Sequence, residues 1–417
     1  MSGFNPDLLQ QIRSRFAQVD HCPVQGPRIF FENAGGALTL NSVVETSARY
    51  AAIPDNQGRA NSGSEELVRV IDQAKTDMRE FMNARDGQFF VGESGTELLF
   101  RLITVACLGT ARGARVLGST LEHPATRSAC ARWSGIAGQT HVLVAHDDAT
   151  GTVGADHYRP EITPDTVVAT ILHTSPVTGM AVDVAAVAQE IRKVAPDCLI
   201  IVDGIQHAAH GRIDIASYDI DGYVISPYKA FSRHGYGLAW ISDRLAKLPH
   251  DSLIGGPADN WEMGTRDTGA YATLSDVAAY FDWLGGQVSD APDRRGRFLA
   301  AGAAIHDHEK MLTDAMINGI GNVPGLRDMP GVTIIGGPDN PAREGLVSLT
   351  VDGIAAPDVV DRLNAQGIRT HTRKPDHYSG NILNPLGLEG CVRVSMCHYN
   401  SPEEVSEFLA AMKDIAG

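Results

Sequence analysis

The chain has 417 residues, of which 43% are hydrophobic and 20% charged, and this composition is that of a globular protein. Its length suggests roughly two to three domain-sized units. The net charge is -15 and no long basic run occurs, which argues against a surface for nucleic acid or anionic membranes.

The N-terminal sequence MSGFNPDLLQQIRSRF lacks the apolar core of a signal peptide, and no stretch approaches the ~18 apolar residues of a membrane span. We therefore expect a cytoplasmic protein. The six cysteines form no CxxC pair, which is typical of buried thiols in a reducing compartment. The close histidine pairs, His207 with His210 and His306 with His308, lack partners at metal-site spacing, so we predict no metal site.

Periodic apolar residues predict an amphipathic helix over 64–84, with Ser64 as its N-cap. Further along, a second helix is predicted over 184–195. Between such helices lie short apolar segments, which we interpret as strands: 114–119, 141–145, 166–172, 198–203, 222–226 and 237–242. This alternation predicts right-handed βαβ units and a mainly parallel sheet.

After about residue 270 the pattern changes to long helical stretches, a few strands and a final helix from Ser401. These features predict a smaller α+β domain. We therefore expect an N-terminal segment over 1–30 that packs with the small domain, a large domain over 31–270 and a small C-terminal domain over 271–417.

An acid ends one predicted strand and a lysine follows the next: Asp203 in CLIIVDGIQHAAHG and Lys229 in SPYKAF. In an open parallel sheet, ligands bind beyond the carboxyl ends of the strands, so these two side chains can face one pocket. Pyridoxal phosphate chemistry needs such a pair. The amine anchors the aldehyde, and the carboxylate keeps the ring nitrogen protonated and electron-withdrawing.

The order of segments resembles the class V branch of fold-type I pyridoxal phosphate enzymes, the group of cysteine desulfurases and their relatives. It is most similar to a desulfurase-like subgroup of poorly assigned activity. The resemblance runs from FFENAGGAL at 30–38 to HYNSPEEV at 398–405. It implies an α/β fold whose large domain has a mainly parallel seven-stranded sheet, pyridoxal 5'-phosphate as cofactor, and a homodimer.

Three motifs of this resemblance imply cofactor contacts. GESGTELLF implies that Gly95 and Thr96 bind the phosphate, where a helix N-terminus favours an anion. LEHPATRSA implies that His123 stacks on the pyridine ring. VDGIQHAAHG implies that Asp203 holds the ring nitrogen and that Gln206 donates to the ring hydroxyl.

Three later motifs complete the expected site. SPYKAF implies Ser226 as a phosphate ligand and Lys229 as the lysine that binds the aldehyde. Tyr228 stands where desulfurases usually have histidine, and the tyrosine hydroxyl can still donate to phosphate. NWEMGTRDTGAY implies that Thr265 reaches the phosphate of the partner subunit, so that active sites are shared. CVRVSMCHYN implies that Arg393 clamps the substrate α-carboxylate.

Two departures from the family pattern bear on the reaction. The loop over 368–388 holds no cysteine nucleophile, and Lys374 stands where a desulfurase has it. In HTSPVTGM, Pro176 stands near the place of a family asparagine, and the sequence leaves open whether Ser175 or Thr178 replaces it. The role of Lys374 and of that loop also stays open.

The function predicted first is an enzyme acting on the Cα–H bond of an amino acid, either class V aminotransferase-like or a β-eliminating C–S lyase. Transamination, β-elimination and epimerisation share their first step, so cysteine desulfurase or amino-acid epimerase activity is the alternative. A nicotinamide-dependent dehydrogenase is disfavoured because no clear GxGxxG turn follows an early strand. A non-catalytic binding protein that keeps the fold is the remote alternative.

Overall fold

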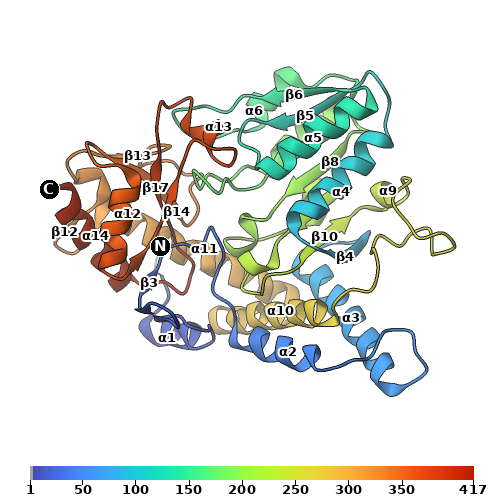
Figure 1. Ribbon diagram of the computed structural model, residues 1–417, viewed down its shortest axis with the longest axis horizontal. Coiled ribbons are helices and arrows are strands. Elements are labelled where there is room, and N and C mark those ends of the chain that lie inside the picture. Colours follow the sequence, from blue (N-terminus) through green and yellow to red (C-terminus); the bar gives the residue numbers. More distant parts are fainter. Residues whose placement is uncertain (1–2) are drawn as a thin grey trace.

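The computed structural model describes residues 3–417 and shows a large α/β part beside a smaller α+β part (Figure 1). The large part is built on a seven-stranded sheet in the order β4-β10-β9-β8-β7-β5-β6, in which only β10 runs antiparallel to its neighbours. The predicted seven-stranded, mainly parallel sheet is therefore confirmed. Its strands are β4 (Gln88–Gly92), β5 (Arg115–Ser119), β6 (Thr140–Val144), β7 (Thr166–Leu172), β8 (Leu199–Asp203), β9 (Gly222–Ile225) and β10 (Gly237–Ile241).

Helices cover both faces of this sheet because its buried strands alternate side chains between the two faces. In β8, Ile201 packs toward one layer and its neighbours Ile200 and Val202 toward the other. The first layer contains α4 (Gly95–Leu108) and α5 (Pro124–Ala137). The second contains α2 (Asn41–Ala51), α3 (Ser62–Phe81), α7 (Val184–Val194) and α10 (Thr268–Val288).

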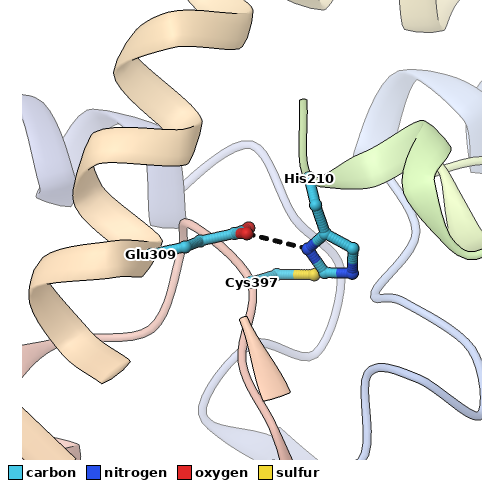
Figure 2. A group of neighbouring side chains, drawn as sticks. All are labelled: His210, Glu309 and Cys397. Atoms are coloured by element: carbon cyan, nitrogen blue, oxygen red, sulfur yellow. Dashed lines mark hydrogen bonds and ion pairs between the residues drawn. The ribbon is translucent and has the colours of Figure 1, made fainter. Parts of the chain in front are cut away.

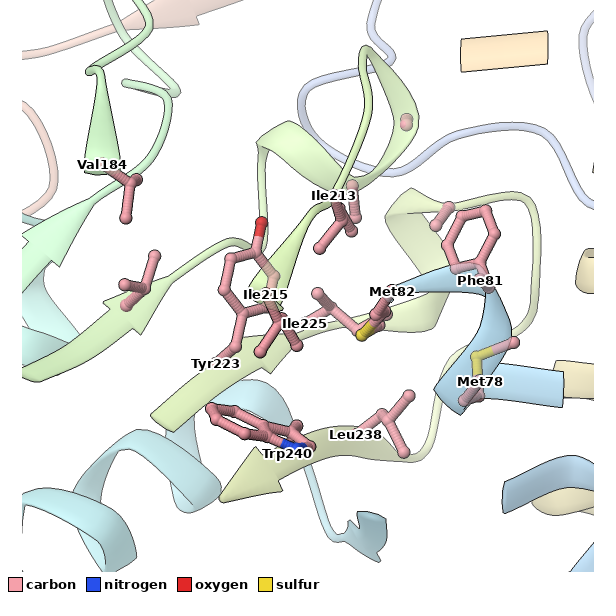
Figure 3. Packing of buried hydrophobic residues seen from close by; sticks show 14 of the residues in the cluster. Met78, Phe81, Met82, Val184, Ile213, Ile215, Tyr223, Ile225, Leu238 and Trp240 are labelled. Atoms are coloured by element: carbon pink, nitrogen blue, oxygen red, sulfur yellow. The ribbon is translucent and has the colours of Figure 1, made fainter. Parts of the chain in front are cut away.

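The end of α3 shows how the second layer packs. Met78 and Phe81 belong to the same buried hydrophobic cluster as Leu238 and Ile225 of the sheet (Figure 3). Burying a side chain of this size stabilises the fold by about 1.5–3 kcal/mol. The apolar stripe that predicted the helix is therefore its core face.

The start of α3 differs from the prediction. The helix begins at Ser62, and Asn61 is its N-cap, because the Asn61 side chain accepts a hydrogen bond from the Ser64 backbone N–H. The Ser64 hydroxyl instead donates to the Asn56 carbonyl and accepts from the Arg59 N–H. The expected cap at Ser64 was wrong because the loop before the helix uses that hydroxyl.

The smaller part contains an antiparallel sheet in the order β13-β14-β17-β16. Helices α12 (Ala356–Ala365) and α14 (Pro402–Ala416) pack against it, and Ser401 caps α14 as expected. The short strand β3 (Ile29–Phe30) pairs in parallel with β15 (Ile368–Arg369), which brings the N-terminal region to this part. The sheet strands are β13 (Val332–Ile334), β14 (Leu346–Val351), β16 (His371–Arg373) and β17 (Cys391–Ser395).

A long helix, α11 (Arg294–Asn318), contributes to the cores of both parts. Phe298 and Ile305 in its first half belong to the core of the large part, whereas Leu312 and Met316 in its second half belong to that of the small part.

Among residues 3–417, no helix combines the length and apolar character needed to cross a membrane. The shorter elements are α1 (Pro6–Arg13), β1 (His21–Cys22), β2 (Gly26–Pro27), α6 (Ala155–Tyr158), α8 (Ile215–Tyr218), α9 (Asp243–Ala246), β11 (Gly319–Ile320), β12 (Val323–Pro324) and α13 (Gly380–Leu383).

A buried polar group joins the segment before β14 to the large part. The Glu344 carboxylate accepts a hydrogen bond from the Thr174 hydroxyl at 2.7 Å and lies 3.1 Å from His207 Nδ1. The His207 ring in turn stacks on His173, with ring centroids 3.5 Å apart. Burial alone would raise the pKa of Glu344, because it disfavours the charged form. The surrounding histidines, of which His207 acts most strongly, outweigh burial and lower the pKa of Glu344 to about 2.

We expect Glu344→Gln to lower the free energy of unfolding by about 1.5–3 kcal/mol at neutral pH, the usual worth of a hydrogen bond to a charged group. A carboxyl whose pKa is lower in the folded state stabilises the fold above its unfolded pKa of about 4.3, and this contribution is lost as the pH falls toward the folded value. Urea unfolding at neutral pH and near the folded pKa measures both effects.

The exposed carboxylate of Glu389 provides the control, Glu389→Gln. The wild type and this control should lose stability between the two pH values by the same amount, and Glu344→Gln by less. Equal acid sensitivity of all three proteins would contradict the role given to Glu344.

Candidate active site

A pocket lies at the carboxyl ends of the parallel strands, where open α/β sheets place their ligands. Strand β8 delivers Asp203 to it, and the turn after β9 delivers Ser226 and Lys229. The pocket is lined by Thr96, His123, Leu172, Pro176, Asp203, Ile205, Gln206, Ser226, Tyr228 and Lys229. Most of the residues that the sequence proposed for one site therefore meet in one cavity.

Lys229 presents its amine inside this pocket. Its Nζ donates a hydrogen bond to Gln206 Oε1 at 3.1 Å. Burial first, and then the charge of the nearby Arg393, lower the pKa of Lys229 to about 7, while Asp203 acts in the opposite direction. Near neutral pH a large fraction of this amine is therefore unprotonated and nucleophilic.

Asp203 is a buried carboxylate without a cation bonded to it among residues 3–417. Its Oδ1 accepts a hydrogen bond from the Ile205 backbone N–H at 3.1 Å, and its Oδ2 accepts from the Thr126 hydroxyl at 3.4 Å. Burial raises the pKa of Asp203 to about 6. Sequence reasoning missed Thr126, although it lies in the same LEHPATRSA motif as His123, at the start of α5.

One end of the pocket is suited to an anion. Gly95 begins α4, whose first backbone N–H groups point out of the helix. A Cβ atom at Gly95 would lie 2.4 Å from Ser226 Oγ, so the glycine lets the start of α4 pack closely against Ser226. Thr96 lies at the same helix start. Tyr228 stacks on His234, with ring centroids 4.2 Å apart, and its ring also faces the pocket.

His123 forms another wall of the pocket and is the N-cap of α5, where its Nδ1 accepts from the Ala125 backbone N–H at 3.2 Å. Burial first, and then the charge of Lys229, lower the pKa of His123 to about 3. The imidazole is therefore neutral and can present a flat face to a ligand. Tyr378 lies beside it, with ring centroids 5.7 Å apart.

Arg393, on β17, is buried with 3% of its surface exposed. It does not line the pocket wall directly, but its Nη1 donates to the carbonyl of the lining residue Pro176 at 3.0 Å. Burial first, and then the charge of the neighbouring Arg373, lower the pKa of Arg393 to about 9. Ser175 and Thr178 are both buried with their hydroxyls bonded to backbone groups, and neither lines the pocket.

Thr265, like Gly95 and Arg393, is an expected site residue that does not line this pocket. It is exposed on the long loop between α9 and α10, and this loop also exposes the apolar side chains of Leu253 and Ile254. Its expected contact is with a partner subunit, so it stays a prediction.

Behind the pocket, a buried hydrogen-bonded chain supports Gln206. Its Nε2 lies 3.2 Å from Nε2 of His210, and Nδ1 of His210 lies 2.7 Å from a Glu309 carboxylate oxygen. Figure 2 shows the His210–Glu309 pair with Cys397 beside it; their potential ligand atoms lie within 4.8 Å of one another. Since Glu309 and Gln206 already bond to His210, the arrangement fixes the orientation of this imidazole.

Cys397 is the cysteine that follows the strand of Arg393. Its thiol is 1% exposed, and burial raises its pKa well above the usual value, which makes it a poor nucleophile. Cys397 is therefore one of the buried thiols that the cysteine pattern led us to expect.

We therefore expect that no persulfide forms on the protein during turnover and that Cys397→Ser leaves sulfur release from cysteine unchanged. Mass spectrometry of the wild-type protein after incubation with cysteine checks the first point. Cys22→Ser, at a half-exposed cysteine, is the control. An adduct of one sulfur atom that disappears only in Cys397→Ser would contradict this expectation and restore a desulfurase mechanism.

The fold and the pocket define an α/β enzyme of the fold-type I transferase class. The profile of the family described as aminotransferase class-V matches residues 29–277 and 299–408. The chain therefore belongs to the aminotransferase class-V family, as the sequence motifs predicted.

Several characterised proteins are similar over nearly the whole chain. "Aminotransferase-like protein FGM3" of Gibberella zeae is 25% identical over 97% of this chain and 98% of its own length. "Probable cysteine desulfurase" of Vibrio cholerae is 23% identical over 97% of each chain. "Cysteine desulfurase-like protein ustD" of Aspergillus flavus is 25% identical over 95% of this chain and 89% of its own.

Solved structures agree in fold. The apo structure of cysteine desulfurase from Thermococcus onnurineus NA1 superimposes with a TM-score of 0.83 at 20% identity, covering 100% of this chain and 99% of that one. Cysteine desulfurase CsdA from Escherichia coli gives a TM-score of 0.78, also at 20% identity and with coverage of 100% and 99%. The predicted fold class is confirmed.

Proposed function

We propose that the pocket binds pyridoxal 5'-phosphate and that the enzyme acts on the Cα–H bond of an amino acid, as a class V aminotransferase-like enzyme or a β-eliminating C–S lyase. One observation carries the proposal: Asp203 and Lys229, at the ends of the neighbouring strands β8 and β9, enter the same pocket. One is a buried acid without a bonded cation, and the other is a buried amine with a lowered pKa.

The residues of the pocket fit this cofactor. The start of α4 at Gly95 and the Ser226 hydroxyl lie together at one end of the pocket and suit a phosphate group, with Thr96 and Tyr228 as further donors. Asp203 suits a protonated ring nitrogen, because a buried carboxylate gains most from a cationic partner. His123 offers its neutral ring to the pyridine face, and Gln206 offers its amide to the ring hydroxyl.

Bound pyridoxal phosphate supplies an electron sink for a broken bond at the substrate Cα. The protein's own groups supply the rest. Asp203 holds a proton at the ring nitrogen, and Arg393 binds the α-carboxylate and thereby fixes the angle of the Cα bonds. The Lys229 amine would remove the Cα proton, for which a pKa near neutrality suits it.

Among the alternatives, the loop over 368–388 supports β-elimination or transamination over persulfide transfer, because it offers Lys374 and no thiol. Epimerisation shares the same proton abstraction. The names of the relatives, which include both aminotransferase-like and desulfurase-like proteins, agree with this range of reactions.

The working unit in this proposal is a homodimer with shared active sites. The loop of Thr265 supports it, because Leu253 and Ile254 expose 64% and 108% of their surfaces there. Apolar side chains exposed side by side on a loop are typical of an interface.

Uptake of pyridoxal phosphate by cofactor-free protein tests the proposal through the visible absorption band that covalent attachment produces. Only the unprotonated amine attacks an aldehyde, so the rate should rise with pH and level off above about 7, following the lowered pKa of Lys229. An exposed lysine, with a pKa of about 10.4, would give a rate that keeps rising. Absence of the band, or that continued rise, contradicts the proposal.

A further inference from the structure

Arg393 and Arg373 lie on one face of the small-domain sheet. Strands β16 and β17 are antiparallel, with His371 opposite Arg393 and Arg373 opposite Cys391. Residues directly opposite each other share a face, and so do residues two apart in one strand. Arg373 is therefore the diagonal neighbour of Arg393, at a typical separation of roughly 7–8 Å.

Neither arginine has an anionic partner within the part of the chain that the structure describes. The Nε atoms of both are buried and form no hydrogen bond, and neither guanidinium lies within 4.0 Å of a carboxylate oxygen. Glu32 and Asp376 attract Arg393 and Arg373 from a greater distance. Glu32 is paired instead with His371, at 3.2 Å.

Arg373 also lies near the pocket, although it does not line it. Its guanidinium lies 5.8 Å from the ring centre of Tyr378, and the Tyr378 ring lies beside that of His123. Its positive charge acts on Lys229 and on His123, both of which line the pocket. The guanidinium groups of the buried Arg393 and the half-buried Arg373 repel each other, and this arrangement is unfavourable unless an anion joins them.

One arginine suffices for the single α-carboxylate of an ordinary amino acid. We propose that the substrate is an acidic amino acid, with Arg393 binding its α-carboxylate and Arg373 binding a second anionic group, a carboxylate or sulfinate, on its side chain. This inference rests on the proposed function and names the substrate class of the same site. The more exposed position of Arg373 suits the distal group, and the buried Arg393 suits the group next to Cα.

Binding of matched amino acids to the cofactor-loaded enzyme tests this assignment. Aspartate with asparagine, and glutamate with glutamine, differ by one charge at nearly constant shape. The dissociation constants come from the change in the visible spectrum and from calorimetry, so turnover is not needed. We expect the wild type to bind at least one of the two acids at least about tenfold more tightly than its amide, as a buried charge pair requires.

In Arg373→Gln this preference for the acid should disappear while the amide binds as before, and Arg373→Lys should keep part of it. Arg327→Gln, at an exposed arginine outside the site, is the matched control and should keep the full preference. Thermal unfolding of each variant shows that it is folded; if Arg373→Gln is not, Arg373→Lys decides.

Equal binding of both acids and their amides by the wild type overturns the inference, and so does an Arg373 variant that weakens acid and amide equally. In both cases the visible band and amino acid binding remain, so the proposed function stands. If the band itself never forms, the proposed function fails and this inference fails with it.

Discussion

Lys229→Ala is expected to lose covalent attachment of the cofactor and to lower turnover by on the order of 10²–10⁴-fold, the usual contribution of a positioned general base. The reason is local: among the pocket-lining residues, Lys229 supplies the only primary amine, and its lowered pKa makes it reactive near neutral pH. Borohydride reduction of the loaded enzyme, followed by peptide mapping, should place the cofactor on the peptide that contains SPYKAF.

Lys247→Ala serves as the control, because Lys247 is exposed and does not line the pocket. It should take up cofactor and turn over as the wild type does. Cofactor mapped to Lys247 or to any other lysine would contradict the assignment of Lys229 as the lysine that binds the cofactor.

Arg393→Leu has the second largest expected effect. It should weaken the binding of α-carboxylate substrates by about 2–5 kcal/mol, the range for removing one partner of a buried charge pair. The visible spectrum of the bound cofactor should stay normal, because Arg393 donates its hydrogen bond to Pro176 and not to a residue proposed to hold the cofactor. Spectral titration with one amino acid measures both quantities.

Arg327→Leu, at an exposed arginine paired with Asp339, controls for the loss of a positive charge. Unchanged affinity in Arg393→Leu would mean that the carboxylate binds elsewhere, with Arg373 or Arg369 as the next residues to test. A loss of the spectrum together with the affinity would instead point to a structural role of Arg393.

The fold could be predicted largely because its signals are local. Apolar strands alternating with amphipathic helices determine a parallel sheet, and the strand ends then bring Asp203 and Lys229 together. The strand β4 was not predicted, since a five-residue apolar segment before a helix gives no periodicity of its own. The cap of α3 was misplaced because Asn61 and Ser64 are both favourable caps in sequence.

What could not be predicted depends on contacts between distant segments. Thr126 reaches Asp203 across 77 residues, and Glu344 reaches Thr174 across 170. The alignment of Arg373 with Arg393 follows from the register of β16 against β17, and a slip of one residue would turn Arg373 to the opposite face. No local pattern encodes that register.

Helix α11 sets the geometry between the two halves of the active site. It spans 25 residues, about 37 Å at 1.5 Å per residue, and is anchored at one end in the core that positions Lys229 and at the other in the core that positions Arg393. Because α11 is anchored in both cores, any opening between them would require this helix to tilt or its anchoring side chains to repack. The span from the Lys229 amine to the Arg393 guanidinium therefore depends on how α11 packs against both cores.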